Sequence, residues 1–219
     1  MIHNNPQTDI LLIDKPKGIS SFDVIRVLRK RFNLTPKSKE WKMGHAGTLD
    51  PLATGLLLVG IGSGTKQLKG LIGLSKEYEA SIRLGIKTES GDLDGCIVLE
   101  KPIPVLSMID LEKIIHGMVG RHDIKPAIYS AIKKGGKPLY KYAREGKSVA
   151  IPIKNMVVEE AELLSFSDNE VRVRFVVSSG TYIRSLGELF AERLGTVGTL
   201  SDLRRTRIGQ YRVEEAMIL

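Results

Sequence analysis

One stretch of the chain decides its fold: Gly44-His45-Ala46-Gly47-Thr48-Leu49-Asp50-Pro51-Leu52-Ala53-Thr54-Gly55. The apolar run that follows, 56–62, is typical of a buried strand. Pro51 disfavours the α conformation at Asp50, so this carboxylate lies in a loop, and the glycines allow backbone to approach it closely. A lone Asp-Pro pair usually forms a turn in which the aspartate bonds only its own backbone. The density of turn-forming residues here favours instead one carboxylate presented rigidly at the edge of a core.

The composition is that of a soluble globular protein with an excess of positive charge. Of 219 residues, 42% are hydrophobic and 26% are charged, and the formal net charge is +8. This charge favours a polyanionic partner, with nucleic acid ahead of a membrane, although basic charge for solubility alone stays open. No apolar run is long enough to span a membrane, and the polar first residues carry no signal peptide. We therefore expect a cytoplasmic protein.

Metal, disulfide and nucleotide chemistry find little support in the sequence. Cys96 is the single cysteine, which excludes an internal disulfide, and we expect it to be a small core residue. The four histidines lie at no metal-ligand spacing. A phosphate loop is suggested by the glycines of 60–66 but fails on spacing, because Thr65 separates Gly64 from Lys66.

Strand patterns outnumber helical ones. The alternation over 76–84 predicts a half-buried antiparallel strand with Tyr78 on its apolar face. Residues 157–166 and 171–177 predict a hairpin around Asp168-Asn169. Because the predicted pairings are antiparallel, we expect one α+β domain over residues 1–219, built on a large mixed, mainly antiparallel sheet with flanking helices.

Helices are predicted between these strands. Ser20 and Asp23 have the spacing of a capping box, and the helix that they open places a set of apolar residues on one face, Phe22, Ile25, Leu28 and Phe32. A second helix covers about 181–194 and follows directly after a strand. Arg184 lies in its first turn, where the helix dipole is unfavourable to a cation, so this arginine needs a partner. A buried carboxylate would supply one, whereas a weak surface salt bridge is the commoner arrangement.

Positive charge gathers in two places. One segment mixes lysines and arginine with tyrosines beside a Gly-Gly turn, namely Lys133, Lys134, Lys137, Lys141, Arg144 and Lys147 with Tyr129, Tyr140 and Tyr142. The other is Arg204, Arg205 and Arg207. Such runs usually form solvated faces, but lysines interleaved with tyrosines also suit a groove that tracks a nucleic-acid backbone and stacks bases. The sequence favours neither interpretation.

Taken together, the motifs resemble the TruB-type tRNA pseudouridine synthases along nearly the whole chain. The matching segments, in order, are Lys15-Pro16-Lys17-Gly18-Ile19-Ser20-Ser21, Gly44 to Gly55, Lys76-Glu77-Tyr78, Tyr129-Ser130-Ala131-Ile132-Lys133, Leu139-Tyr140, Tyr142-Ala143-Arg144, Gly180-Thr181-Tyr182-Ile183-Arg184 and Leu203-Arg204-Arg205. Each segment is weak alone, and the ordered set is highly specific.

The resemblance implies a reaction and a set of site residues. Members of this family isomerise the uridine at position 55 in the T loop of tRNA to pseudouridine, without cofactor or metal. Asp50 would be the catalytic carboxylate, Tyr78 would stack on the flipped base and Arg184 would pair with Asp50. The resemblance further implies that His45 contacts the T loop and that Tyr182 and Leu203 line the pocket. From the clustered charge we expect Lys133, Lys137 and Arg144 of the basic segment to bind the RNA. The expected partner is the T-arm stem-loop of tRNA, bound by a monomer.

One departure from the family concerns the end of the chain. Family members usually continue into a C-terminal PUA domain that grips the acceptor stem, and here the sequence stops at Leu219. We expect residues 1–219 to be the catalytic domain, with the PUA domain absent or truncated.

Two other functions stay open at this stage. A catalytically silent RNA-binding or RNA-folding module would use the same groove without needing Asp50 or Arg184. A glycosidase-like hydrolase usually needs two carboxylates that flank the bond. Asp92 and Asp94 are expected in a polar turn, so no second acid is predicted in a comparable apolar loop.

Overall fold

The structure is a computed structural model that describes residues 10–34, 41–127, 129, 132–147 and 149–219. The chain forms two compact units. The first unit contains residues 1–78 and 203–219, and the second contains residues 79–202. Two strands change unit along their length: β4 (Lys76–Leu84) begins in the first unit, and β12 (Gly198–Ile208) ends in it.

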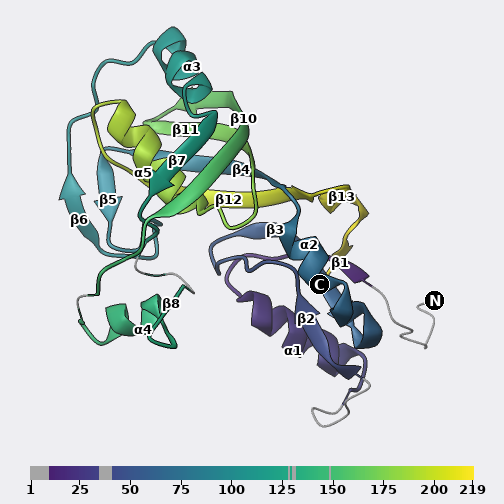
Figure 1. The fold of residues 1–219 in the computed structure, drawn as a ribbon. Coiled ribbons are helices and arrows are strands. Elements are labelled where there is room, and N and C mark those ends of the chain that lie inside the picture. The colour runs from purple at the N-terminus through teal and green to yellow at the C-terminus, as the bar shows by residue number, and fades with distance from the viewer. Residues whose placement is uncertain (1–9, 35–40, 128, 130–131, 148) are drawn as a thin grey trace. The chain divides into compact units, whose positions relative to one another are not determined.

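The first unit is a small mixed sheet with helices against it (Figure 1). Its central strand β3 (Thr54–Ile61) pairs antiparallel with β1 (Ile10–Lys15) and β2 (Met43–His45), and parallel with β12. Two short strands complete it, β13 (Tyr211–Arg212) antiparallel to β12 and β14 (Met217–Ile218) parallel to β1. The helical segments are α1 (Ser21–Arg31), α2 (Leu68–Gly73) and the 3-10 turns η2 (Gly62–Lys66) and η3 (Val213–Glu215).

Strand β3 carries apolar residues on both faces because both faces are covered. Leu57 and Val59 join the core under α1, whereas Leu56 and Leu58 pack in the cluster that includes Leu68 of α2. The capping box of α1 forms as predicted, with Ser20 and Asp23 bonded to each other's backbone. The apolar run after Asp50 is therefore the buried strand that the sequence predicts.

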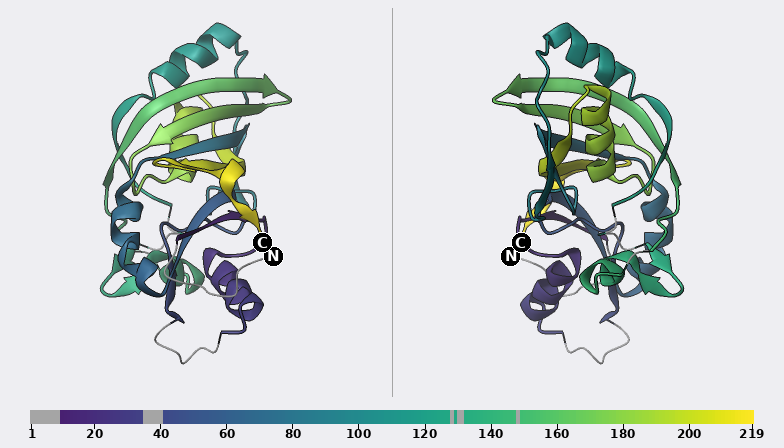
Figure 2. Two further views of the ribbon diagram at one scale, coloured as in Figure 1. Left: turned by 90° about the vertical axis from the view of Figure 1, so that its right-hand side faces the viewer. Right: turned by 90° about the vertical axis from the view of Figure 1, so that its left-hand side faces the viewer.

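The second unit is an antiparallel sheet in which β10 (Lys154–Ser167) pairs with β11 (Glu170–Val177) and β7 (Gly120–Ile124). Figure 2 shows β10 and β11 curving over α5 (Ile183–Arg193). The predicted hairpin turn is present, since Asp168 and Asn169 both have positive φ. The remaining elements are β5 (Ile86–Thr88), β6 (Ile97–Glu100), α3 (Met108–His116), β8 (Lys133–Lys134), β9 (Lys137–Pro138) and α4 (Leu139–Arg144).

The α+β class with a mixed, mainly antiparallel sheet is confirmed. Two residue predictions are wrong. Cys96 is exposed, because it immediately precedes the exposed strand β6. Phe22 is 58% exposed, because the buried side of α1 is centred on Val24, Ile25 and Leu28, and position 22 lies away from that side.

Candidate active site

The loop that carries Asp50 is fixed from several sides within the first unit. The Ser21 hydroxyl donates to the Leu49 carbonyl oxygen (3.0 Å) and accepts from the Leu49 amide (2.8 Å). The Gly18 amide donates to the Pro51 carbonyl oxygen at 2.8 Å, and the Ala53 amide closes a turn on the Asp50 carbonyl oxygen at 3.0 Å. Because the residues on both sides of Asp50 are tied down, its half-buried side chain is presented from a rigid support.

Arg205 links this loop to the sheet, and it is only 1% exposed. Its Nε donates to the Leu56 carbonyl oxygen (2.7 Å), and Nη2 donates to the Gly47 carbonyl oxygen (3.1 Å). Nη1 lies 3.4 Å from the Tyr78 hydroxyl oxygen. Gly55 faces Arg205 across the β3–β12 pair and has a φ of +101°. A Cβ at position 55 would lie 2.7 Å from the backbone nitrogen of Arg205. A glycine at 55 therefore permits the close approach that brings this guanidinium under the loop.

The arginine cluster at 204–207 makes contacts within the first unit. Arg204 makes a two-pronged ion pair with Asp14, at 3.1 and 2.7 Å, and Arg207 lies 3.5 Å from a Glu77 carboxylate oxygen. Alternation along β12 turns Arg205 inward, where it meets carbonyl groups instead of solvent. Charge spacing alone could not separate this buried arginine from its neighbours.

Two lysines in the first unit are also buried. Lys15 is 0% exposed and donates to the Pro16 (2.9 Å) and Ile19 (2.8 Å) carbonyl oxygens. Burial lowers the pKa of Lys15 to about 8, although the negative charge of Asp50 opposes that shift. Lys76 is 5% exposed, and burial together with Arg205 lowers its pKa to about 8 as well. The surroundings of the loop are therefore electropositive, and neither lysine is predicted as a site residue from the sequence.

The other predicted residues of the first unit lie around Arg205. Tyr78 is 7% exposed, as the alternation of β4 predicts, and its ring centre is 5.9 Å from the guanidinium carbon. Leu203 lies two residues before Arg205 on β12, hence on the same face, and is 6% exposed. His45 ends β2, where burial and then the charge of Arg205 lower the pKa of its imidazole, so the ring is neutral at neutral pH. Arg205 therefore bonds the loop between His45 and Asp50 on one side and approaches Tyr78 on the other.

The second unit holds the remaining predicted residues, and Arg184 has well-defined partners there. It is 7% exposed, and it donates from Nη1 to the Ser90 carbonyl oxygen (2.6 Å) and from Nη2 to the Tyr129 carbonyl oxygen (2.8 Å). Asp92 lies 3.5 Å from Nη1. Tyr182 is the residue that immediately precedes α5. The pairing of Arg184 with Asp50, which lie in different units, stays a prediction.

Asp92 corrects the expectation of a polar turn. Its side chain is 8% exposed, and Oδ1 accepts a hydrogen bond from the Ser90 hydroxyl at 2.5 Å. A backbone bridge to Leu200 of β12 holds the segment inside the unit. The burial of this carboxylate is not predictable from local sequence, because Arg184 lies 92 positions away and no local pattern connects the two residues.

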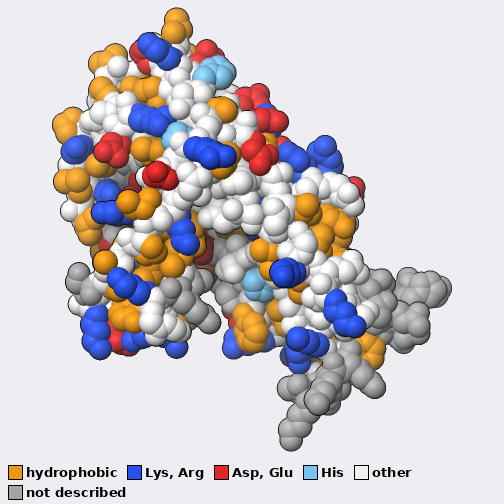
Figure 3. Space-filling view, viewed as in Figure 1, with side chains coloured by type: hydrophobic (Ala, Val, Ile, Leu, Met, Phe, Trp, Pro, Cys, Tyr) orange, Lys and Arg blue, Asp and Glu red, His pale blue; other side chains and the backbone are white. Residues whose placement is uncertain are grey.

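The basic segment around α4 has its own ion pairs. Lys137 bonds Glu145, and its ammonium lies 4.8 Å from the centre of the Tyr142 ring. Lys147 reaches the same carboxylate at 3.2 Å. Blue side chains gather over α4 in the space-filling view (Figure 3). The side chains of Lys133 and Arg144 lie outside the described part of the structure, so the predicted RNA groove stays a prediction.

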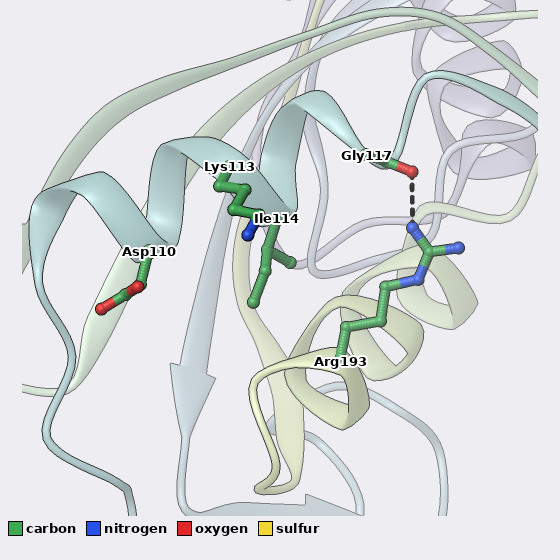
Figure 4. A pocket seen from close by; sticks show the side chains of 5 residues that line it. All are labelled: Asp110, Lys113, Ile114, Gly117 and Arg193. Atoms are coloured by element: carbon green, nitrogen blue, oxygen red, sulfur yellow. Dashed lines mark hydrogen bonds between the residues drawn. The ribbon is translucent and has the colours of Figure 1, made fainter.

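A pocket of about 440 Å³ lies between α3 and α5 and contains none of the predicted site residues. Figure 4 shows its lining, in which Arg193 donates to the Gly117 carbonyl oxygen at 2.6 Å. Among the described residues, no group of histidine, cysteine or acidic side chains could hold a metal ion. Within the same residues, no helix is long and apolar enough to cross a membrane.

Comparisons with known proteins agree with these motifs. Residues 30–183 match the model of the "TruB family pseudouridylate synthase (N terminal domain)". The tRNA pseudouridine synthase B of Psychrobacter cryohalolentis is 38% identical over 96% of this chain, and that of Francisella tularensis subsp. novicida is 43% identical over 96%. The chain spans 58% and 68% of the lengths of these two relatives, respectively.

The fold also has solved counterparts. The matching chain in a crystal structure of a Cbf5-Nop10-Gar1 complex superposes with a TM-score of 0.71, covering 98% of this chain and 58% of that one at 24% identity. At this identity the likeness supports the fold alone. The family model, which covers most of the chain, decides the assignment. The chain belongs to the TruB family of pseudouridylate synthases.

Proposed function

We propose that the protein isomerises uridine to pseudouridine at position 55 in the T loop of tRNA, with Asp50 as the catalytic carboxylate. The observation that carries this proposal is the half-buried Asp50, in a loop bonded by Ser21 and Arg205 beside the buried ring of Tyr78. Relatives named tRNA pseudouridine synthase B support the substrate class. The proposal extends to a cytoplasmic monomer that needs no cofactor.

The reaction fits what these residues offer. The bond from the ribose C1′ to uracil N1 breaks, the base rotates, and C1′ bonds to C5, while the C5 proton is lost and N1 gains one. The carboxylate of Asp50 can add to the base, attack the ribose or deprotonate the sugar, and each route needs its ionised form. The positive charge of Lys15 beside it favours that form.

The base must also leave the stack before it can react. A flipped base needs an aromatic or apolar platform, and Tyr78 and Leu203 provide both kinds of surface. His45 carries no positive charge at neutral pH, so we assign its ring a stacking contact with the T loop. For the basic segment with Lys133, Lys137 and Arg144, and for Tyr182, we propose contacts with the RNA.

The direct test is an assay on a bare T-arm stem-loop, with pseudouridine detected by chemical labelling. We expect product at the position that corresponds to uridine 55. Free uracil without pseudouridine would identify a hydrolase instead. Tight binding without either product would identify a silent RNA-binding module.

The proposed pairing of Arg184 with Asp50 has its own test. Arg184→Met should move the acid limb of the pH–rate profile to higher pH, because the carboxylate loses a stabilising positive charge. Arg184→Lys should restore only part of the activity, since an ammonium cannot reproduce the planar fork of donors. An unmoved acid limb in a folded Arg184→Met variant would contradict the pairing with Asp50 and leave Arg184 a structural role, through contacts such as those with Ser90, Tyr129 and Asp92.

A further inference from the structure

The outer face of α1 is a basic surface that the proposed reaction does not use. The helix contributes four cations, Arg26, Arg29, Lys30 and Arg31, against one acid, Asp23. Asp23 is already engaged, since it accepts hydrogen bonds from Ser20 in the capping box. Its ion pair with Arg26, at 2.6 Å, involves an arginine side chain that is 69% exposed and therefore adds little stability.

The cations combine with an exposed aromatic ring in one stripe. At 3.6 residues per turn, Phe22, Arg26, Arg29 and Lys30 fall within an arc of about 100°, on the side away from Val24 and Leu28. Phe22 is 58% exposed, and the Arg26 guanidinium lies 5.0 Å from its ring centre. The helix dipole accounts for cations in the last turn but not for Arg26 or the exposed ring. Over the region of α1, the space-filling view shows blue side chains beside orange ones (Figure 3).

The stripe begins beside the candidate active site. Ser21, in the first turn of α1, holds the backbone of Leu49 through both of its hydrogen bonds, and Asp50 is the next residue. Phe22 follows Ser21 directly, and the eleven residues of α1 then extend about 16 Å away from that tie. A polynucleotide held at Asp50 can therefore continue along this helix.

We infer that the Phe22–Lys30 stripe of α1 is a second RNA-binding surface, which contacts the sugar-phosphate backbone of the substrate outside the reacting nucleotide. The inference rests on the proposed function, because RNA must be the substrate. Arg26, Arg29 and Lys30 supply charge for phosphates, and the Phe22 ring supplies an apolar contact for a ribose or base. An anionic membrane surface would be the other possible partner. A membrane-bound helix buries an apolar face in the lipid, whereas this stripe has cations along its centre and a single exposed aromatic ring.

The experiment measures binding of an unmodified tRNA transcript over a range of salt concentrations, in an Asp50→Asn background that prevents turnover. Arg26→Gln/Lys30→Gln should weaken binding and reduce the log–log salt slope by about 0.7–0.9 for each lost phosphate contact. Phe22→Ala should weaken binding and leave the slope unchanged, because no charge is lost. The matched control is Arg31→Gln/Arg212→Gln, which removes two exposed cations of the same unit, one of them on the far side of α1. It should leave the slope close to that of the parent.

Three results would overturn the inference. An equal slope change in the control pair would mean that only the overall charge matters, and an unchanged slope in Arg26→Gln/Lys30→Gln would mean that the stripe faces solvent. If Arg26→Gln/Lys30→Gln lost binding to vesicles of mixed anionic and neutral phospholipids but kept its affinity for tRNA, the stripe would be assigned to a membrane. These titrations need no turnover, so a parent protein that makes no pseudouridine would contradict the proposed function without deciding the role of α1.

Discussion

Gly55 is the residue at which backbone geometry most directly limits the sequence. Gly18 and Gly55 both have positive φ, but only at Gly55 would a Cβ meet other atoms within 4 Å, namely the backbone of Arg205. Gly18→Ala should therefore cost about 1–2 kcal/mol of unfolding free energy, from backbone strain alone. Gly55→Ala should cost about 1–3 kcal/mol more, because a backbone contact cannot be relieved by a rotamer change. Denaturant unfolding of both variants checks this, and equal losses would contradict the close approach of β12.

The burial of Lys76 leads to a second prediction at the residue scale. Because burial lowers the pKa of Lys76 to about 8, the unfolded chain binds more protons than the folded one between about pH 8 and 10.5. Folding stability gains from this lysine as pH rises through that window, and the cost of its buried charge is fully present below pH 8. Lys76→Met should therefore flatten the pH dependence of the unfolding free energy by about 1.4 kcal/mol per pH unit in that window.

The control is Lys69→Met, at an exposed lysine of α2 in the same unit. It should leave the curve parallel to that of the parent. A Lys76→Met curve parallel to the parent above pH 8 would show that the ammonium is not buried.

Residue types and local spacing were sufficient to single out Asp50 and to place Tyr78 on a buried face. They were insufficient for Arg205, whose hydrogen bond to Gly47 joins residues 158 positions apart. Lys15 and Lys76 belong to motifs that were recognised in the sequence, but the motifs do not indicate burial. A lysine is buried only where carbonyl groups converge on its ammonium group. That convergence depends on how turns and strands pack, which no local pattern specifies.

Among the elements, the loop between β5 and β6 and the start of α5 depend on each other. An arginine in the first turn of a helix opposes the helix dipole, and Asp92 supplies a buried opposite charge to Arg184. Asp92→Ala should lower the unfolding free energy by about 1–3 kcal/mol, because it removes an opposite charge beside the buried arginine and the buried hydrogen bond from Ser90. Asp94→Ala, at an exposed position of the same loop, should change it by less than about 0.5 kcal/mol. Similar small effects from both substitutions would mean that the other partners of Arg184 suffice to stabilise it.

Elements were predictable where their determinants are local. The capping box of α1, the alternation of β4 and the turn at Asp168-Asn169 all depend on neighbours within a few residues. Phe22 was wrongly predicted on the buried face of α1, because helical spacing alone is compatible with that position. The side of α1 that is buried is determined by its packing against β1 and β3. The burial of Asp92 likewise follows from its bridge to β12, more than a hundred residues along the chain.

At the scale of the whole molecule, the predicted site residues divide between the two units. His45, Asp50, Tyr78 and Leu203 belong to the first unit, and Tyr182 and Arg184 to the second. The family assignment could be anticipated from sequence because the motifs occur in order along the chain. The contacts of Arg205 within the first unit could not, since they join segments far apart in the sequence.

The measurement that tests the central claim most directly is turnover of the T-arm stem-loop by Asp50→Asn. The amide keeps the size of the side chain but removes its charge, so pseudouridine formation should fall to background while RNA affinity and thermal stability stay near those of the parent. Asp94→Asn, an exposed control, should keep the parent rate. Turnover near the parent rate in a folded Asp50→Asn protein would contradict the catalytic role of this carboxylate.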